Sequence, residues 1–329
     1  MFDYIRKINL QLFADPNTNV TGDSGLTKEM KTFYDMTLID EASPNLVHDQ
    51  FAQKRPIPAN GGKKIEFRKF ASLPKALTPL TEGVTPDGKK LTVTSIEAEV
   101  SQYGDYIVQS DVLELTTIDN TIVEAIKILG RQAGLTLDTI TRNILHSATN
   151  QWFCPKGDGT SVSSIAGLDN TCLLTVDVVK QIVADLKANN APKINGDYVA
   201  IIHPYVAYDL MTDPEWIEAH KYAKPDNIYE GEIGKIAGVR FVESSEAKVY
   251  ENGVFGSIFL ADGAYGVTEI TGGGLQTIVK QKGSAGTADP LDQRSSVGWK
   301  AMKTAEILVQ PYMALVYSKS KLSSKAVAN

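Results

Sequence analysis

Residues of the types that perform chemistry occur in this 329-residue sequence, but their spacing matches no common catalytic or ligand-binding motif. No HExxH pattern or comparable ligand spacing occurs, and Gly-x-Ser-x-Gly, P-loop and GxGxxG sequences are also absent. The glycines Gly231, Gly234 and Gly238 precede a predicted strand and are explained by turns. The four histidines are far apart, and a structural role is the simpler interpretation of each: His48, His146, His203 and His220. We therefore predict no catalytic residue, no metal site and no cofactor.

Acidic side chains leave one enzymatic alternative open. A catalytic pair of carboxylates can form on folding without a motif in the sequence, and the chain has 39 Asp and Glu residues. An α/β enzyme with an acid pair in residues 175–290 is therefore kept as an alternative. A monomer with a polar pocket would support it.

The composition is that of a globular protein that binds neither nucleic acid strongly nor membranes. Hydrophobic residues make up 43% and charged residues 22% of the chain, and the net charge is −6. An acidic chain is a poor match for tight phosphate binding, and no stretch reaches the ~18 apolar residues of a membrane helix. Cys154 and Cys172 form no CxxC motif, which indicates a reducing compartment rather than a disulfide framework.

The first part of the chain is predicted to form a loosely structured arm. Residues 1–14 lack the continuous apolar segment of a signal peptide, and residues 15–25 are mostly turn and linker types. Residues 26–40 have the apolar spacing of one helix. Proline and glycine residues between positions 56 and 62 then break the chain.

Two alternating segments predict a long two-stranded ribbon. Residues 64–70 and 91–100 alternate apolar and polar side chains, and residues 103–108 continue the second strand past a bulge at Gly104. Residues 73–88 form the tip, which is rich in Pro, Thr and Gly. Because a ribbon of two polar strands is not stable alone in water, it must lie on the body of its own chain or on a neighbouring chain.

The strongest periodic signal predicts one long helix at about residues 119–149. Apolar residues recur at steps of three and four from residue 118 to residue 148, which is one face of an α-helix. Such a helix would be about 45 Å long at ~1.5 Å per residue. Gly130 and Gly134 each weaken helix propensity by roughly 1 kcal/mol, so we expect curvature there. The side chains predicted to form its core face are Ile122, Ile126, Leu129, Leu137, Ile140 and Ile144.

The remainder of the chain alternates helices and strands irregularly, which is typical of the α+β class. A helix is predicted around residues 178–186. Strands are predicted at residues 198–202, 239–242, 257–261, 305–309 and 313–317.

At the ribbon and the long helix the sequence resembles the N-four-type major capsid proteins of tailed bacteriophages. The start, residues 9–14 (NLQLFA), is similar to that of many phage coat proteins. The other segments that carry the resemblance, in order, are 62–70 (GKKIEFRKF), 78–88 (TPLTEGVTPDG), 102–106 (QYGDY), 110–111 (SD), 130–138 (GRQAGLTLD), 201–204 (IIHP), 208–210 (YDL), 231–234 (GEIG) and 238–242 (GVRFV).

This resemblance implies an HK-ninety-seven-type coat fold and the function of a major capsid protein in the head shell around a double-stranded DNA genome. It implies an N-terminal arm at 1–62 and an extended loop at 63–108 that overlaps a neighbouring subunit. It also implies a peripheral domain at 109–174 and 296–329 with a spine helix at about 118–149, and an axial domain at 175–295.

The resemblance also implies partners and a location. The partners would be copies of the chain in pentamers and hexamers, a separate scaffolding protein, a portal protein, a decoration protein and loosely held DNA, with no membrane. The chain would be a virion component assembled in the host cytoplasm. We expect five charged residues of the extended loop in or beside intersubunit salt bridges: Lys75, Glu82, Asp87, Lys89 and Lys90. An encapsulin-like nanocompartment, which has the same fold around an enzyme cargo, is the nearest alternative, ahead of the enzyme.

Overall fold

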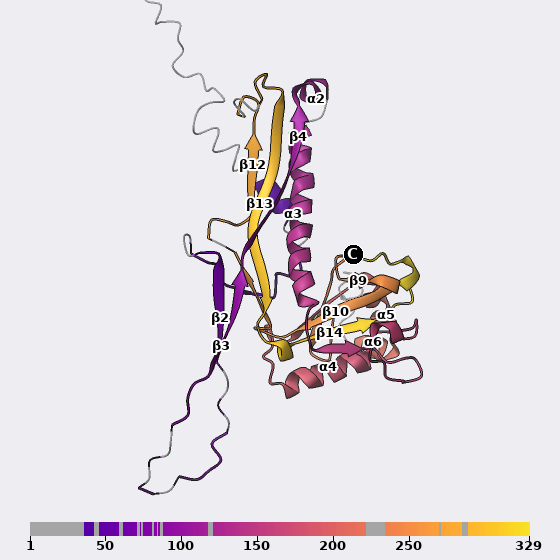
Figure 1. Ribbon diagram of the computed structural model, residues 1–329. Coiled ribbons are helices and arrows are strands. Elements are labelled where there is room, and N and C mark those ends of the chain that lie inside the picture. Colours follow the sequence, from indigo (N-terminus) through magenta and orange to yellow (C-terminus); the bar gives the residue numbers. More distant parts are fainter. Residues whose placement is uncertain are drawn as a thin grey trace, which may run out of the picture.

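The computed structural model describes residues 36–42, 46–58, 62–70, 73, 75–80, 82–83, 85, 88–117, 121–221, 234–269, 271–284 and 289–329. These residues form two bodies and a ribbon (Figure 1). In the first, the spine body, the long helix α3 lies along a sheet. In the second, the sheet body, three helices accompany a larger sheet. Of the helix expected at residues 26–40, only residues 36–40 are described; they are helical, and the helix continues to residue 42.

The spine body is held together by the apolar side of α3 (Thr121–Leu145). Ile126, Leu129 and Leu137 are buried in one core cluster with the inward side chains of β13. The five-stranded sheet has the order β1–β11–β13–β12, and β4 pairs along β13. Its strands are β1 (Gln53–Lys54), β4 (Ser101–Ser110), β11 (Tyr265–Thr268), β12 (Gln276–Lys280) and β13 (Arg294–Ile307). The helix ends at Leu145, four residues earlier than expected, and a short helix α2 (Asp111–Thr116) precedes it.

Two glycines of the spine body have packing roles that the sequence did not reveal. A Cβ atom on Gly130 would lie 2.9 Å from the carbonyl oxygen of Leu38, so the glycine lets the 36–42 helix pack directly on α3. The bulge predicted at Gly104 is wrong, because β4 and β13 pair one to one from Ser101 to Ser110. A Cβ atom on Gly104 would lie 2.5 Å from the carbonyl oxygen of Trp299. Close backbone approach therefore explains both glycines.

The sheet body contains a mixed seven-stranded sheet of order β5–β14–β10–β6–β8–β7, with β9 beside β10. Every residue of β6, β10 and β14 is buried, and the apolar side of α4 joins the same core. The predicted helix at 178–186 and the predicted strands at 198–202, 239–242, 257–261 and 313–317 are confirmed. The elements are β5 (Gln151–Phe153), α4 (Val176–Ala188), β6 (Tyr198–Ile202), α5 (Pro204–Met211), α6 (Pro214–Lys221), β7 (Lys235–Ile236), β8 (Val239–Glu243), β9 (Val249–Tyr250), β10 (Val254–Leu260) and β14 (Met313–Ser318).

Several strands pair with segments that the expected division of the chain places in another part. β4 falls within the expected extended loop, but it pairs with β13 in the spine body. β12 falls within the expected axial domain and also pairs with β13. β14 falls within the expected peripheral domain, and it pairs with β10 and β5 in the sheet body. Strand pairing joins segments far apart in sequence, so local pattern did not reveal these partners.

The ribbon consists of β2 (Lys64–Phe70) and β3 (Val93–Glu99), which pair antiparallel along their whole length. Both predicted strands are thus confirmed. At the base, Phe67 and Ala98 are buried, while the described residues between β2 and β3 lead away from the bodies (Figure 1). The ribbon is therefore anchored at one end and protrudes at the other.

Replacing Ile126 with aspartate is expected to prevent stable folding, because it places an unpaired charge in a fully buried position of α3. We expect a loss of at least ~4 kcal/mol in the free energy of unfolding, measured by urea denaturation. Ile128→Asp on the same helix is the matched control, since Ile128 is 60% exposed. Equal losses in the two variants would contradict the assignment of the buried side of α3.

Candidate assembly surface and buried junction

Four of the five charged residues predicted to make intersubunit contacts lie in the protruding part of the ribbon. Lys75, Glu82, Lys89 and Lys90 are exposed, and within the described part of the chain none of them forms an ion pair. Asp87 lies outside the described residues. These side chains are thus free to meet charges of another molecule, whereas the charged pairs nearer the base of the ribbon are made within the chain.

Apolar side chains are also exposed along the protruding segment. Leu77 is 82% exposed and Leu80 is 78% exposed, and Leu73 and Leu91 are more than half exposed. Large aliphatic side chains clustered in one protruding segment are unusual on a monomer and typical of an interaction surface. The tip therefore combines apolar and charged groups that have no partner among the described residues of their own chain.

The base of the ribbon is fixed by one aromatic side chain. The Phe67 ring fills the space above Gly266 of β11, where a Cβ atom would lie 2.9 Å from the ring. The Arg55 guanidinium lies 5.8 Å from the centre of the same ring, a favourable cation–π distance. Further out, Arg68 pairs with Glu66 at 3.1 Å. Hydrogen bonds from Ser95 and Arg68 lower the pKa of the Glu66 carboxyl.

A second exposed surface lies on the side of the β12–β13–β4 sheet that faces away from α3. Tyr106 is 68% exposed, and Val108 and Ile278 are also exposed. Tyr106 and Ile278 border a shallow groove of about 300 Å³ that includes Gly298. A Cβ atom on Gly298 would lie 2.7 Å from the Cβ atom of Tyr106, so glycine keeps the floor of the groove open. This surface is a second candidate for contact with other molecules.

The predicted core residues of the long helix divide between two clusters. Ile126, Leu129 and Leu137 are buried in the spine cluster, and Ile122 and Ile140 are partly buried against it. Ile144 packs instead against the large cluster of the sheet body. The C-terminal half of α3 therefore packs against the cores of both bodies.

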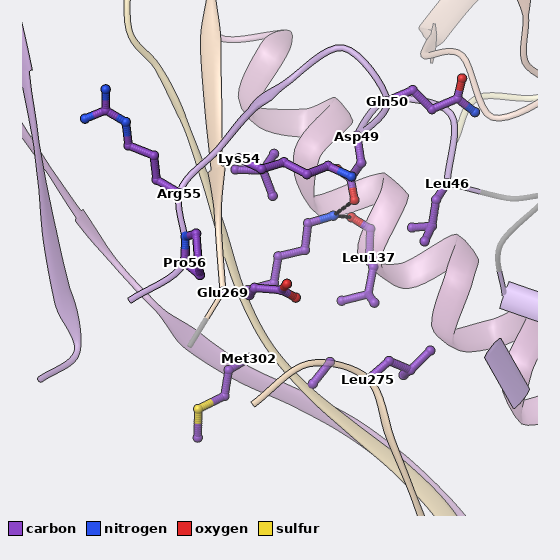
Figure 2. Close-up of a pocket in the computed structure, with 13 residues that line it drawn as sticks. Leu46, Asp49, Gln50, Lys54, Arg55, Pro56, Leu137, Glu269, Leu275 and Met302 are labelled. Atoms are coloured by element: carbon purple, nitrogen blue, oxygen red, sulfur yellow. Dashed lines mark hydrogen bonds and ion pairs between the residues drawn. The ribbon is translucent and has the colours of Figure 1, made fainter. Parts of the chain in front are cut away.

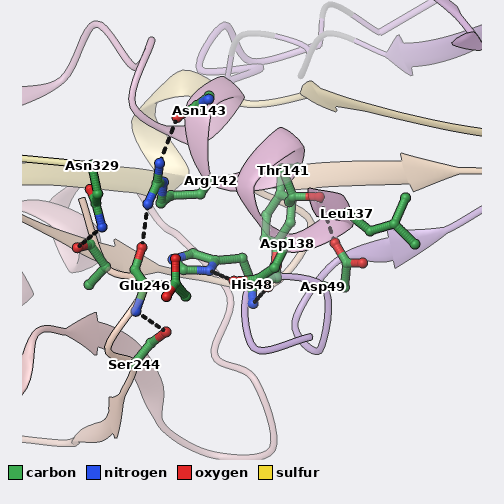
Figure 3. A network of polar contacts seen from close by, with 12 residues as sticks. His48, Asp49, Leu137, Asp138, Thr141, Arg142, Asn143, Ser244, Glu246 and Asn329 are labelled. Atoms are coloured by element: carbon green, nitrogen blue, oxygen red, sulfur yellow. Dashed lines mark hydrogen bonds and ion pairs between the residues drawn. The ribbon is translucent and has the colours of Figure 1, made fainter. Parts of the chain in front are cut away.

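A buried polar pair that the sequence did not predict joins α3 to residues 46–58, which we call the strap. The Nδ1 atom of His48 lies 2.7 Å from Asp138 Oδ2, and the His48 backbone N–H donates to Asp138 Oδ1 at 2.8 Å (Figure 3). Both side chains are fully buried. Because a carboxylate only accepts hydrogen bonds, Nδ1 carries the proton. The Tyr265 hydroxyl donates to the His48 carbonyl oxygen, and burial raises the pKa of that hydroxyl well above its usual value.

The next strap residue, Asp49, makes a second set of polar contacts. Its carboxylate accepts a hydrogen bond from Thr141 of α3 at 2.6 Å and pairs with Lys303 of β13. Lys303 also donates to the Leu137 carbonyl oxygen at 2.8 Å. Burial lowers the pKa of Lys303, and the nearby Asp49 charge opposes that shift. Asp49, Leu137 and Lys303 line a cavity of about 360 Å³ between the strap, α3 and β13 (Figure 2).

On another side of α3, two side chains reach the sheet body. Arg142 donates to the backbone carbonyl oxygen of Glu246 at 2.7 Å (Figure 3), and burial lowers the pKa of its guanidinium. His146 lies just after the end of α3, and its Nδ1 atom is 3.0 Å from the Tyr250 hydroxyl. Burial, together with repulsion from His48, Arg142 and Lys248, lowers the pKa of His146 to about 3. His146 is therefore neutral near pH 7.

We call the contacts of His48, Asp49, Asp138, Thr141, Arg142 and Lys303 the polar junction. Asp138 and Arg142 are four residues apart and lie on the same helical stripe. Their partners, His48 and Glu246, are distant in sequence, so spacing alone did not identify the pair. A charged residue beside the apolar core position Leu137 was the only local signal.

The other residues considered for chemistry have structural surroundings. The His203 ring accepts a hydrogen bond from the Tyr205 backbone N–H at 3.1 Å at the start of α5, and burial lowers its pKa. Cys154 and Cys172 are buried and unpaired with each other, and the His220 side chain lies outside the described residues. Among the residues described, no group of three or more His, Cys, Asp or Glu side chains could hold a metal ion. The same residues include no helix long and apolar enough to cross a membrane.

The fold of the chain is similar to that of several solved phage capsids. The chain is similar to the cyanophage P-SCSP1u capsid protein, with a TM-score of 0.64 and 14% identity over 82% of this chain and 87% of that chain. It is similar to the chain of the cyanophage Pam1 capsid, with a TM-score of 0.65 and 13% identity over 85% and 92%. The capsid of Ralstonia phage GP4 gives a TM-score of 0.60 and 13% identity over 82% and 87%. The fold is thus an HK-ninety-seven-type phage coat fold.

A sequence model of the family described as phage capsid protein matches residues 84–280, which is more than half of the chain. The chain belongs to this phage capsid protein family. Its function is that of a major capsid protein, a structural component of the virion. No protein with curated annotation matches the chain at a significant level of similarity.

Removing the ring of His48 is expected to destabilise the protein strongly. The His48→Ala variant leaves the Asp138 carboxylate buried without its ring partner, and breaking a buried pair in this way typically costs ~3–5 kcal/mol. Urea denaturation measures the loss. The double variant His48→Leu with Asp138→Leu should lose less than His48→Ala, because no unpaired charge remains. A double variant less stable than the single one would contradict this account.

Acid is expected to destabilise the protein partly through His146. The folded-state pKa of about 3 lies below the ordinary value of 6.5, so the unfolded chain binds more protons between these pH values. Stability therefore falls as the pH drops from 7 towards 3. The free energy of unfolding of His146→Gln should depend less steeply on pH in this window. Parallel curves for the variant and the wild type, from denaturation at successive pH values, would overturn the prediction.

Proposed function

We propose that this major capsid protein assembles with itself, as pentamers and hexamers, into the icosahedral head shell that encloses the double-stranded DNA genome of a tailed phage. The observation that best supports this proposal is the exposure of the ribbon tip. Its exposed leucines and charged residues have no partner among the described residues of the chain, and an identical neighbour would supply one. In a closed symmetric shell every copy gives and receives the same contact.

We propose that the two bodies occupy different positions in the shell. We assign the sheet body to the axial domain, around the five-fold and six-fold axes, and the spine body to the peripheral domain. This division places β5 and β14 in the axial domain and β4 and β12 in the peripheral domain, because their strand pairing lies there. The extended loop then comprises β2, β3 and the segment between them.

Further partners follow from the same proposal. A separate scaffolding protein would guide assembly, a portal protein would occupy one vertex, and a decoration protein would bind the outside of the finished shell. The net charge of −6 favours weak, non-specific contact with the packaged DNA. Assembly would take place in the host cytoplasm. We assign no catalytic step to the chain.

The encapsulin-like nanocompartment is the second candidate, because the same fold can enclose an enzyme cargo. Shells from infected cells distinguish the two candidates: the proposed capsid contains DNA, and a nanocompartment contains protein. Negative-stain images of the purified chain test both against the enzyme alternative. A protein that stays monomeric with and without scaffolding protein would contradict any shell function.

Hydrogen exchange is expected to show that the ribbon tip becomes ordered by its neighbours. Residues 71–90 should exchange quickly in the isolated subunit and slowly in the shell, because Lys75, Glu82, Asp87, Lys89 and Lys90 would enter salt bridges and the leucines would become covered. The buried strand β6 serves as the internal control, since it should be protected in both states. Equal protection of residues 71–90 in both states would refute the tip contact.

A further inference from the structure

The chain passes between the spine body and the sheet body at three places, and each connection is short. α3 leads to β5, β10 leads to β11, and β13 leads to β14. Apolar residues at these crossings, including Tyr265, Val267 and Ile307, belong to the large core cluster of the sheet body. Apolar burial holds two bodies together but is non-directional, so it does not by itself select one angle between them.

Directional contacts between the bodies come from the end of α3 and from the strap. Arg142 donates to the Glu246 carbonyl oxygen at 2.7 Å, and His146 contacts the Tyr250 hydroxyl at 3.0 Å. From the strap, the Phe51 ring lies 5.6 Å from the guanidinium carbon of Arg240 in β8. Hydrogen bonds weaken steeply when they are misaligned, so these contacts favour one relative orientation.

The strap in turn fixes the rotation of α3. His48 binds Asp138 through both its backbone and its ring. Asp49 binds Thr141 on the next turn and Lys303 on β13. The helix is therefore held on one side by the strap and the spine sheet, and on another by the backbone of the sheet body.

The polar junction buries charged and polar side chains at positions that apolar side chains could fill, and this burial costs free energy. Asp138, Arg142 and His48 are all at most 2% exposed, and His48 Nε2 and Arg142 Nε have no hydrogen-bond partner among the described residues. Buried ionic groups often stabilise no better than apolar ones of similar size. Their clearer contribution is geometric, because they define partners and directions.

We propose that the polar junction sets the angle between the spine body and the sheet body and thereby the curvature of the shell. This inference rests on the proposed shell function. Helix α3 has 25 residues and is about 37 Å long, so a rotation of about 5° at the junction moves its far end by about 3 Å. A displacement of that size, repeated in every copy, changes the angle at which neighbouring subunits meet.

The first experiment measures the angle in the isolated subunit. Leu115→Cys in α2 and Glu218→Cys in α6 place spin labels on exposed positions of the two bodies, and the native cysteines are buried. Arg142→Met removes the hydrogen bond to Glu246, together with the longer one to the neighbouring Asn143, and Arg142→Lys restores a donor. We expect a narrow distance distribution in the wild type and in Arg142→Lys, and a broadened or shifted one in Arg142→Met. The same narrow distribution in Arg142→Met would overturn the proposal.

The second experiment measures shell diameter by electron microscopy. Arg142→Met should give a several-fold larger fraction of particles outside the wild-type size class, and Arg142→Lys should restore the wild-type distribution. Val183→Ala in α4 is the control for lost stability, because Val183 is buried in the sheet-body core; it should leave the diameter unchanged. If Arg142→Met does not fold, His48→Leu with Asp138→Leu takes its place in both experiments.

The results of these experiments distinguish a failure of this inference from a failure of the proposed function. Wild-type protein that forms no shell with scaffolding protein contradicts the shell function, while the spin-label distances still decide whether the junction sets the angle. A changed angle with unchanged shell diameter overturns the link to curvature. An equal change of diameter in Val183→Ala also overturns it, because lost stability alone would then explain the effect.

Discussion

The contact between the strap and α3 is the interaction on which the arrangement of the molecule depends. His48 and Asp138 form a fully buried pair, and the adjacent Asp49 connects α3 to β13 through its contacts with Thr141 and Lys303. From this position the strap continues into β1, which pairs with β11, and its Arg55 packs on the Phe67 ring of the ribbon. One short segment thus contacts the long helix, both sheets and the base of the ribbon. Because removing one partner of a buried pair is costly, these parts keep their positions together.

Some apolar faces of the molecule are fully covered within one chain, whereas others stay exposed. The sheet body buries whole strands from both faces, which is what an independent core requires. The spine sheet, in contrast, is covered by α3 on one face and exposes Tyr106 on the other. The ribbon exposes Leu77 and Leu80 at its far end. A chain with a stable core and incomplete outer surfaces is suited to function in an assembly of many copies.

Much of the fold could be predicted from the sequence, and the reasons are local. The three- and four-residue steps along α3 and the apolar run at 198–202 reflect contacts that each segment makes along its own length. Alternation identified β2 and β3 for the same reason. The pairing partners of the strands were harder to predict, because β4, β12 and β14 pair with segments far away in the chain. Gly104 illustrates the limit: the sequence pattern predicts a bulge there, whereas the glycine allows the backbone of β13 to approach closely.

The class of protein, the long helix and the ribbon could all be predicted from the sequence, because periodicity and ordered motifs are carried by neighbouring residues. The sequence also indicated that the ribbon needs a partner, since a two-stranded polar ribbon is not stable alone. Only the tertiary structure revealed the polar junction. Asp138 is one charged residue beside Leu137 in sequence, and its partner His48 is 90 positions away. Whether such a residue is solvated or buried against a specific partner depends on how distant segments pack, which folding alone decides.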